Sequence, residues 1–413
     1  MASLSLWHNR AFLRLWTATI VSNAGSKVTA LALPLTAILL LGATPAQMAL
    51  LGIASQVPNV LFGLFAGVWV DRRRRRPILI GADLGRAVLL GSIPVAALIG
   101  HLTFVQLWVV GFASSSLGVF FQIASIAVLP VLVPHVRLVE ANSKLSVSDA
   151  VLSVGGPGLA GGLIQLVSAP VAILADAASY VLSALSLGGI GTAERVLARA
   201  EGRWDVWAGI GEGVRELQRT PVLRALTTFL GIGAIGWAVQ SAVVLLFLVH
   251  TLGFTPATLG IVGTCDGVAA LLASLSVGRV SRILGIGPTV ILGSFLGTVS
   301  DLLVPLAAFV PPPHTLPMVI SAKALAGISV VFTTVPAVSL RQALTPVELL
   351  GRVTAARRFL IFSLGLAGSV LGGFLGNKIG LLPTLFAAVP FSLASSLIVL
   401  CSAVRTVHGV ADN

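Results

Sequence analysis

A long apolar segment that ends in a run of five arginines constrains this chain more than any other feature. Residues 46–70 contain no Asp, Glu, Lys or Arg, and Arg72–Arg76 follow directly after Asp71. An apolar stretch of about 20 residues can cross the roughly 30 Å hydrocarbon core of a bilayer as a helix. Another apolar run begins at Pro77, so the arginines form a short loop. The positive-inside rule assigns that loop to the cytoplasm.

The composition extends this conclusion to the whole chain. Its 413 residues are 56% hydrophobic and 10% charged, with a mean hydropathy of +1.02. Soluble domains carry about 25% charged residues, so the sequence indicates an integral membrane protein. A net charge of +12 would suggest nucleic acid in a soluble chain, but here the basic residues gather in alternate loops. We therefore expect contacts with anionic headgroups at the inner membrane surface and no nucleic-acid partner.

Twelve apolar runs predict an all-α fold of twelve transmembrane helices, at about residues 12–41, 46–70, 77–99, 105–133, 149–167, 170–191, 222–250, 256–277, 287–310, 316–340, 353–377 and 381–404. The even-numbered loops between them are basic, whereas the odd-numbered loops are nearly uncharged, with Lys378 as the exception. This alternation predicts a multi-pass protein of the cell (inner, cytoplasmic) membrane with both termini in the cytoplasm. No small-residue cleavage site follows the first run, so we expect it to be retained as a helix.

The longest polar interval divides the chain into two halves of six helices. We predict an N-terminal bundle at 1–191, a cytoplasmic linker at 192–220 and a C-terminal bundle at 221–413. Apolar residues recur at helical spacing in the linker and predict an amphipathic helix, either packed under the bundle or regulatory: Trp204, Val206, Trp207, Ile210, Val214 and Leu217. Gly278-Arg279 weakly repeats the Gly67 loop, and two pseudo-symmetric halves are typical of alternating-access transporters.

The loop after the second run carries a recognisable motif. Gly67, Asp71, Arg72, Arg75 and Arg76 match Gly-x-x-x-Asp-Arg-x-Gly-Arg-Arg, with Arg74 in place of the second glycine. This sequence resembles the major facilitator superfamily. Further segments resemble its branch of enterobactin exporters and macrolide efflux pumps, among them Asp83-Leu84-Gly85-Arg86, Gly155–Gly162 and Asp176-Ala177-Ala178-Ser179-Tyr180. The resemblance implies a monomeric secondary active transporter that exports a small organic compound, such as a drug or siderophore, coupled to protons.

Two motifs gain roles from this resemblance. The residues Gly67, Asp71, Arg72, Arg75 and Arg76 would form a cytoplasmic gate, although Arg73–Arg76 also fit a determinant of topology alone. In the fifth run, Gly156, Pro157, Gly161 and Gly162 resemble the antiporter motif, which lacks its first glycine here, and suggest export. Glycine-rich helix packing without directional meaning is the alternative.

Charged residues inside apolar runs supply the candidate sites. Asp83 and Arg86 share a helix face and predict a structural ion pair, with proton transfer by Asp83 as the alternative. Lys27, Asp266, Asp301 and Lys323 are expected to face the bundle interior or a watery cavity. Because the first, fourth, seventh and tenth helices line the cavity in this superfamily, the resemblance favours Lys27 and Lys323 and an anionic or polar substrate. Asp266 would neutralise a lysine or carry a proton, with a plain structural partner as the alternative. For Asp301 the alternative is a position close to a membrane face, where it is merely solvated.

Weaker candidates for the cavity wall are polar or amphipathic side chains, which can equally bridge helices: Asn23, Gln122, Trp237, Gln240 and Ser241. Asp149 and Asp176 are expected to be cap or gate residues.

Several kinds of site are not expected. The glycine-rich stretches lack the lysine of a P-loop, so nothing suggests ATP hydrolysis. Six scattered histidines and two cysteines within apolar runs indicate neither a metal site nor a disulfide, and we expect no cofactor. Two alternatives to an exporter remain: a lipid or lysophospholipid flippase of the same fold, and a membrane-embedded enzyme.

Overall fold

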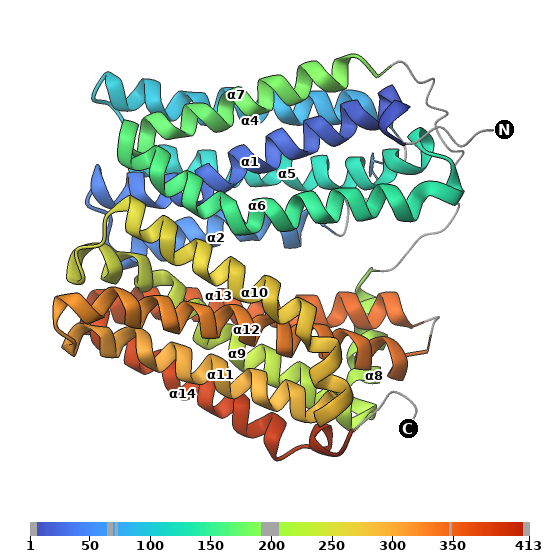
Figure 1. Ribbon diagram of the computed structural model, residues 1–413, viewed down its shortest axis with the longest axis vertical. Coiled ribbons are helices and arrows are strands. Elements are labelled where there is room, and N and C mark those ends of the chain that lie inside the picture. The colour runs from blue at the N-terminus through green and yellow to red at the C-terminus, as the bar shows by residue number, and fades with distance from the viewer. Residues whose placement is uncertain (1–5, 64–68, 71–72, 191–205, 347–348, 408–413) are drawn as a thin grey trace. The chain divides into compact units, whose positions relative to one another are not determined.

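The computed structural model describes residues 6–63, 69–70, 73–190, 206–346 and 349–407, with the side chains of 206–210 excepted. Thirteen α-helices, together with a few short 3-10 or π-helical segments, account for most of this part of the chain, and no strand occurs in it (Figure 1). Ten of these helices are long and apolar enough to cross a membrane. The chain divides into two compact units.

Unit 1 comprises residues 1–43, 51–202 and 255–261. Its main helices are α1 (Arg10–Leu39), α2 (Pro45–Leu61, from Leu51 onward), α4 (Arg75–Leu98), α5 (Phe104–Leu132), α6 (Leu138–Val167) and α7 (Ala169–Gly188). Helix α1 packs along α7 and α6, and α4 packs between α7 and α5 (Figure 1). Buried apolar side chains such as Phe12 and Leu187 fill the core of this unit.

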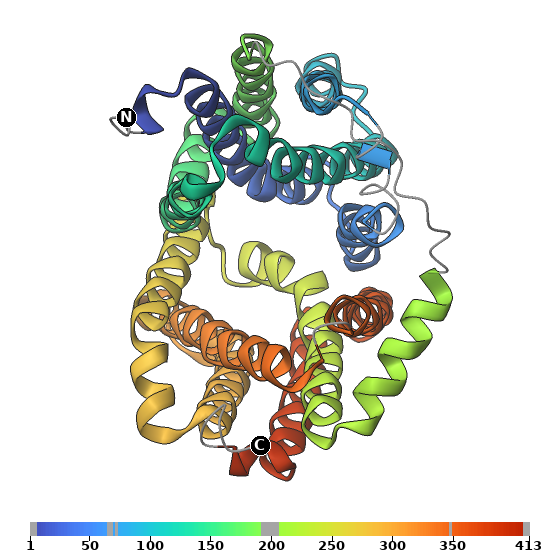
Figure 2. The same ribbon diagram turned by 90° about the vertical axis from the view of Figure 1, so that its right-hand side faces the viewer.

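Unit 2 comprises residues 44–50, 203–254 and 262–413. Its helices are α8 (Val206–Arg219), α9 (Pro221–Leu246), α10 (Pro256–Leu284, from Val262 onward), α11 (Ile286–Leu306), α12 (Pro312–Leu344), α13 (Leu350–Ile379) and α14 (Leu381–Leu400). Helix α11 packs along α12 and α14, and α9 packs along α13 and α14. Figure 2 shows α8 beside the bundle, where its buried Leu217 joins a cluster with Leu223 and Val353.

Local sequence signals explain where several helices begin and end. Asn9 caps α1, since its Oδ1 accepts hydrogen bonds from the amides of Ala11 and Phe12, each at 3.1 Å. Its Nδ2 donates to the carbonyl of Leu132 at 2.9 Å and so fixes the start of α1 against the end of α5. Gly42, with a φ of +59°, turns the chain after α1.

Some helices extend beyond the apolar runs that predict them. Helix α6 begins at Leu138 rather than near residue 149, so Lys144 lies in a helix and not in a loop. Its first turns are stabilised by Glu140, which pairs with Arg137 at 3.0 Å and with Lys144 at 3.6 Å. An apolar run marks the part of a helix that suits hydrocarbon, whereas the polar turns next to it continue the same hydrogen-bonding pattern in water.

The predicted number of twelve spans is not confirmed. Neither α1 nor α2 is among the ten helices long and apolar enough to cross a membrane within the described ranges. Helix α2 is only 17 residues long there, and α1 carries Arg10, Arg14 and Lys27. The all-helical membrane fold itself is confirmed.

Candidate functional site

In unit 1, α1 and α6 form a polar ladder, which we call the Lys27 cluster. Lys27 Nζ donates a hydrogen bond to Ser153 Oγ at 3.1 Å. One turn earlier on both helices, Asn23 Nδ2 donates to Asp149 Oδ1 at 3.5 Å. Lys27 is half-buried and bonds to a neutral hydroxyl, while the carboxylate of Asp149 lies one turn away and is exposed. The structure thus brings two predicted candidates, Lys27 and Asn23, onto one face of α1.

Two glycines of α6 allow close packing around this cluster. A Cβ atom on Gly156 would lie 2.8 Å from Cγ of Lys27, so the missing side chain makes room for the lysine stem. A Cβ atom on Gly161 would overlap the backbone of Pro256 and Gly260 at the start of α10, which belongs to the same unit. The other motif residues, Pro157 and Gly162, lie within α6, which continues through the proline. Close packing therefore accounts for two of the four motif residues.

Asp83 and Arg86 form a buried ion pair inside α4. Ser183 Oγ of α7 donates to Asp83 Oδ2 at 2.6 Å. The Arg86 guanidinium lies over the rings of Tyr180 and Phe121, 4.1 and 4.6 Å from their centroids. Each charge in this pair has a polar or aromatic partner, so the pair joins α4 to α7 and α5.

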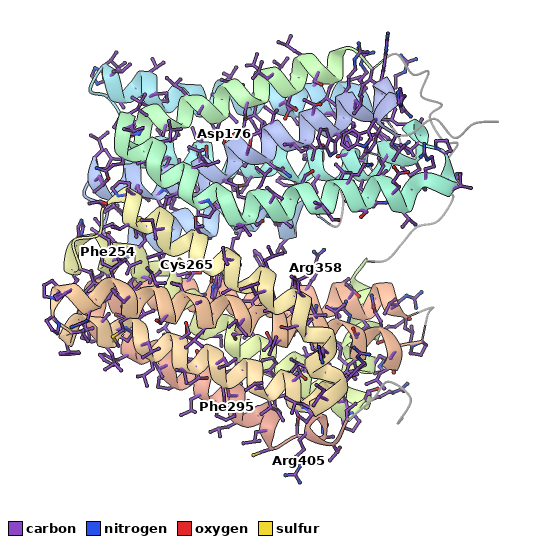
Figure 3. The ribbon with its side chains drawn as sticks, viewed as in Figure 1. Asp176, Phe254, Cys265, Phe295, Arg358 and Arg405 are labelled. Atoms are coloured by element: carbon purple, nitrogen blue, oxygen red, sulfur yellow. The ribbon has the colours of Figure 1, made fainter. Side chains whose placement is uncertain are left out.

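Of the two roles expected for Asp176 and Asp149, the helix cap is wrong, and a role at a gate stays a prediction. Asp176 is fully buried in the interior of α7, where Ser179 Oγ donates to its Oδ1 at 3.2 Å (Figure 3). Gly25 of α1 packs directly against Asp176 and Ser179, because any side chain at that position would overlap them. Asp149 lies well inside α6, since that helix begins eleven residues before it. Helix α6 begins well before the run predicted at 149–167, which moves Asp149 into its interior, whereas α7 (Ala169–Gly188) lies close to the run predicted at 170–191 and Asp176 falls about two turns inside it.

In unit 2, residues from four helices form what we call the Lys323 cluster. Lys323 of α12 interacts electrostatically with Asp266 of α10 and Asp301 of α11, but it makes no direct ion pair with either within the described chain. Ser392 of α14 donates a hydrogen bond to Asp301. Gly327, one turn beyond Lys323, packs against the backbone of Asp266 and so allows α12 and α10 to approach. Three of the four predicted intramembrane charges therefore gather in one unit.

The three candidates of α9 lie on one side of that helix but differ in exposure. Gln240 is buried and lies within electrostatic range of Asp301, which places it beside the Lys323 cluster, but its Nε2 has no hydrogen-bond partner in the described chain. Trp237 is 58% exposed, and Ser241, one turn later, is also exposed and donates to the Ala238 carbonyl at 3.1 Å. Gln122 of α5 is exposed in unit 1.

The cytoplasmic gate motif is described only in part. Gly67, Asp71 and Arg72 lie outside the described residues. Arg75 is buried at the start of α4, and Arg76 donates to the backbone carbonyls of Leu187 and Gly188 at the end of α7. Within unit 1, Arg76 therefore donates to carbonyl groups of the last turn of α7, where the Leu187 carbonyl also accepts from the amide of Ile190 at 3.1 Å.

Sequence reasoning missed two kinds of residue. The hydroxyls of Ser153 and Ser392 satisfy candidate charges, yet serine is frequent in every run and gives no distinct signal. Arg357 and Arg358 lie inside the run at 353–377, which was predicted as an apolar helix. A count of charged residues within that run identifies them. Both interact electrostatically with Arg341 in unit 2.

The side chains of the Lys27 and Lys323 clusters are suited to binding a solute or a proton. No group of three or more His, Cys, Asp or Glu side chains that would hold a metal ion occurs in the described part of the chain. The lysines provide positive charge inside helices long enough to span a membrane, and Asp266 and Asp301 provide compensating negative charge. Such groups can bind a charged or polar solute or exchange a proton.

Comparison with known proteins identifies relatives along most of the chain. A family model described as the Major Facilitator Superfamily matches residues 15–249. The multidrug efflux pump Tap of Mycolicibacterium fortuitum is 28% identical over 391 residues, which cover 90% of each chain. A bacterial homologue of the iron transporter ferroportin, solved in an inward-facing state, has a TM-score of 0.74 at 17% identity and covers 96% of this chain and 99% of its own. The nucleoside transporter NupG has the same TM-score at 12% identity, over 94% of this chain and 99% of its own.

Proposed function

Because the chain belongs to the Major Facilitator Superfamily, we propose that it is an exporter of a small organic compound such as a drug or siderophore. Membership makes it a membrane transporter rather than an enzyme. The observation that carries the proposal of export is the similarity to the efflux pump Tap, which extends over 90% of both chains.

The proposal includes a topology of twelve membrane spans in two six-helix halves. Adding α1 and α2 to the ten apolar helices gives twelve, and it leaves the amphipathic α8 as the linker. The boundaries 1–191, 192–220 and 221–413 divide the chain accordingly, with both termini in the cytoplasm. A lysine on an otherwise apolar helix such as α1 is tolerated where it faces a bundle interior or water.

The Lys27 cluster and the Lys323 cluster would take part in transport in different ways. A solute with a carboxylate or another anionic group would bind at the lysines, which offer charge in a medium of low dielectric constant. Asp266 and Asp301 would compensate Lys323 when no solute is bound and accept a proton during the cycle. Proton coupling of this kind would drive alternating access of two pseudo-symmetric halves.

Transport in proteoliposomes tests the proposal. The protein is reconstituted, a pH gradient is imposed, and movement of a radiolabelled catecholate siderophore, which is anionic, is compared with that of a macrolide, which is cationic. We expect proton-dependent transport of at least one of them, abolished by collapse of the gradient. Transport of neither compound, together with transport of radiolabelled lysophospholipid, would replace the exporter with a flippase of the same fold.

Single substitutions test the residues. Lys27→Met and Lys323→Met should each reduce binding of the transported compound by about tenfold or more, as expected for loss of one charge-assisted hydrogen bond. Lys378→Met is the matched control, since Lys378 is exposed in the last turn of α13. Unchanged binding and transport in both variants would remove the lysines from the site.

A further inference from the structure

Three arginines of unit 2, at the end of α12 and in the first turns of α13, form what we call the arginine cluster: Arg341, Arg357 and Arg358. Arg341 interacts electrostatically with Arg358, and Arg357 interacts with both. No acidic side chain is among the groups that act on Arg341 or Arg357 within the described chain. Three like charges thus lie together without a described counter-charge.

The side chain of Arg341 is buried and has unsatisfied hydrogen-bond donors. Arg341 is only 9% exposed, and its Nε and Nη1 are buried without a hydrogen-bond partner. Nε of Arg357 is also buried without a partner. A buried guanidinium that lacks both a counter-charge and acceptors is costly, because it loses its hydration and gains nothing in return. Unsatisfied buried donors of this kind indicate a ligand that accepts them.

A neighbouring arginine outside the cluster has the acidic partner that the cluster lacks. Arg352, one to two turns before the cluster on α13, pairs with Glu212 of α8. Among the described residues, Glu212 is therefore already engaged by an arginine outside the cluster. Arg358 is exposed at the rim of the cluster, where it extends from α13 (Figure 3). The cluster thus combines buried donors with an accessible charge.

We propose that the arginine cluster is a binding site for a phosphate group, in which Arg341 and Arg357 donate to the phosphate oxygens and Arg358 supplies charge at the entrance. The planar guanidinium offers paired donors that match two oxygens of a phosphate, and several arginines together can satisfy a doubly charged anion. The phosphate can belong to an anionic lipid headgroup or to a free phosphate in solution. This site is separate from the Lys27 and Lys323 clusters, so it does not depend on the proposed export.

Binding to the purified, delipidated full-length protein tests the site. Inorganic phosphate is titrated at constant ionic strength against chloride, and phosphatidylglycerol is titrated against phosphatidylcholine, with the midpoint of thermal unfolding as the readout. A ligand that binds the folded state raises that midpoint with concentration, and the rise yields a dissociation constant. We expect phosphate, phosphatidylglycerol or both to stabilise the protein, and phosphatidylcholine to have no effect.

Variants connect the effect to the cluster. Arg341→Gln should weaken binding by about tenfold or more, because it removes charge-assisted donors. Arg405→Gln is the matched control, since it removes one exposed arginine from the same unit outside the cluster, and it should bind as the unsubstituted protein does (Figure 3). If Arg341→Gln does not fold, the test uses Arg358→Gln, which changes an exposed arginine at the rim of the cluster. This variant should bind the phosphate group about threefold more weakly or worse.

The outcomes identify the source of the phosphate. A response to phosphatidylglycerol alone assigns a lipid headgroup, and a response to inorganic phosphate alone assigns a free anion. Absence of both responses, or an equal response in Arg358→Gln and Arg405→Gln, would overturn the proposal.

Discussion

Replacement of Asp83 with Asn is expected to destabilise unit 1 strongly, because it removes the charge that compensates Arg86. The side chains of Asp83 and Arg86 are 0% and 7% exposed, so water cannot solvate the arginine that remains. Asn has nearly the same shape as Asp and can still accept the hydrogen bond from Ser183. The substitution therefore tests charge and leaves packing almost unchanged.

The expected loss follows from the surroundings of the pair. Removing one partner of a buried ion pair typically costs about 3–5 kcal/mol, since an uncompensated charge stays buried. The rings of Tyr180 and Phe121 still face the Arg86 guanidinium and offset part of this cost. We therefore expect about 3 kcal/mol for Asp83→Asn. Removing both charges, as in Asp83→Asn with Arg86→Gln, should cost at least about 2 kcal/mol less than the sum of the single changes.

Equilibrium unfolding in mixed detergent and SDS micelles, followed by tryptophan fluorescence, measures these differences. Asp149→Asn is the matched control, because it removes an exposed carboxylate from α6 of the same unit and should change the free energy of unfolding by less than about 1 kcal/mol. An Asp83→Asn variant as stable as that control would refute the argument that the pair is a buried structural element. Additive single changes would refute the coupling.

Three further predictions concern packing, a buried acceptor and a surface pair. Gly161→Leu should cost about 1–3 kcal/mol or more in unfolding free energy through overlap with α10, whereas Gly162→Leu should cost less than about 0.5 kcal/mol, because its Cβ would meet no described atom within 4 Å. Ser392→Ala should cost about 1–3 kcal/mol in the same measurement, since it leaves a half-buried carboxylate without its donor. Glu212→Gln should change stability by less than about 1 kcal/mol, because its pair with Arg352 has side chains 47% and 39% exposed.

Helix positions could be predicted well because hydropathy is a local property of the chain. The run expected at 381–404 corresponds to α14 (Leu381–Leu400), and the run at 222–250 corresponds to α9 and the turn that follows it. Helix ends could not be predicted as well, because polar turns outside the hydrocarbon remain helical when their side chains pair. In α6, for example, Glu140 forms ion pairs with Arg137 and Lys144 in the polar turns that precede the apolar run.

The candidate sites could be predicted only as single charges. That Lys323 lies in an apolar run is visible in the sequence, but its neighbours depend on how four helices are rotated about their axes. Asp266, Asp301 and Ser392 come from three different helices, and no spacing along the chain relates them. Asp83 and Arg86 are the contrasting case: they lie three residues apart on one helix, so their pairing follows from helical geometry.

The two lysines differ in what compensates them, and this difference predicts unequal roles. Lys323 has two carboxylates within electrostatic range, so an anion arriving there competes with charges already present. Lys27 bonds to the neutral Ser153, so an anion gains more by binding there. For an anionic siderophore, Lys27→Met should therefore weaken binding several-fold more than Lys323→Met, whereas Lys323→Met should alter the dependence of transport on the proton gradient more. Equal effects of both variants on both measurements would contradict this division, because they would mean that the carboxylates do not shield Lys323 from the solute.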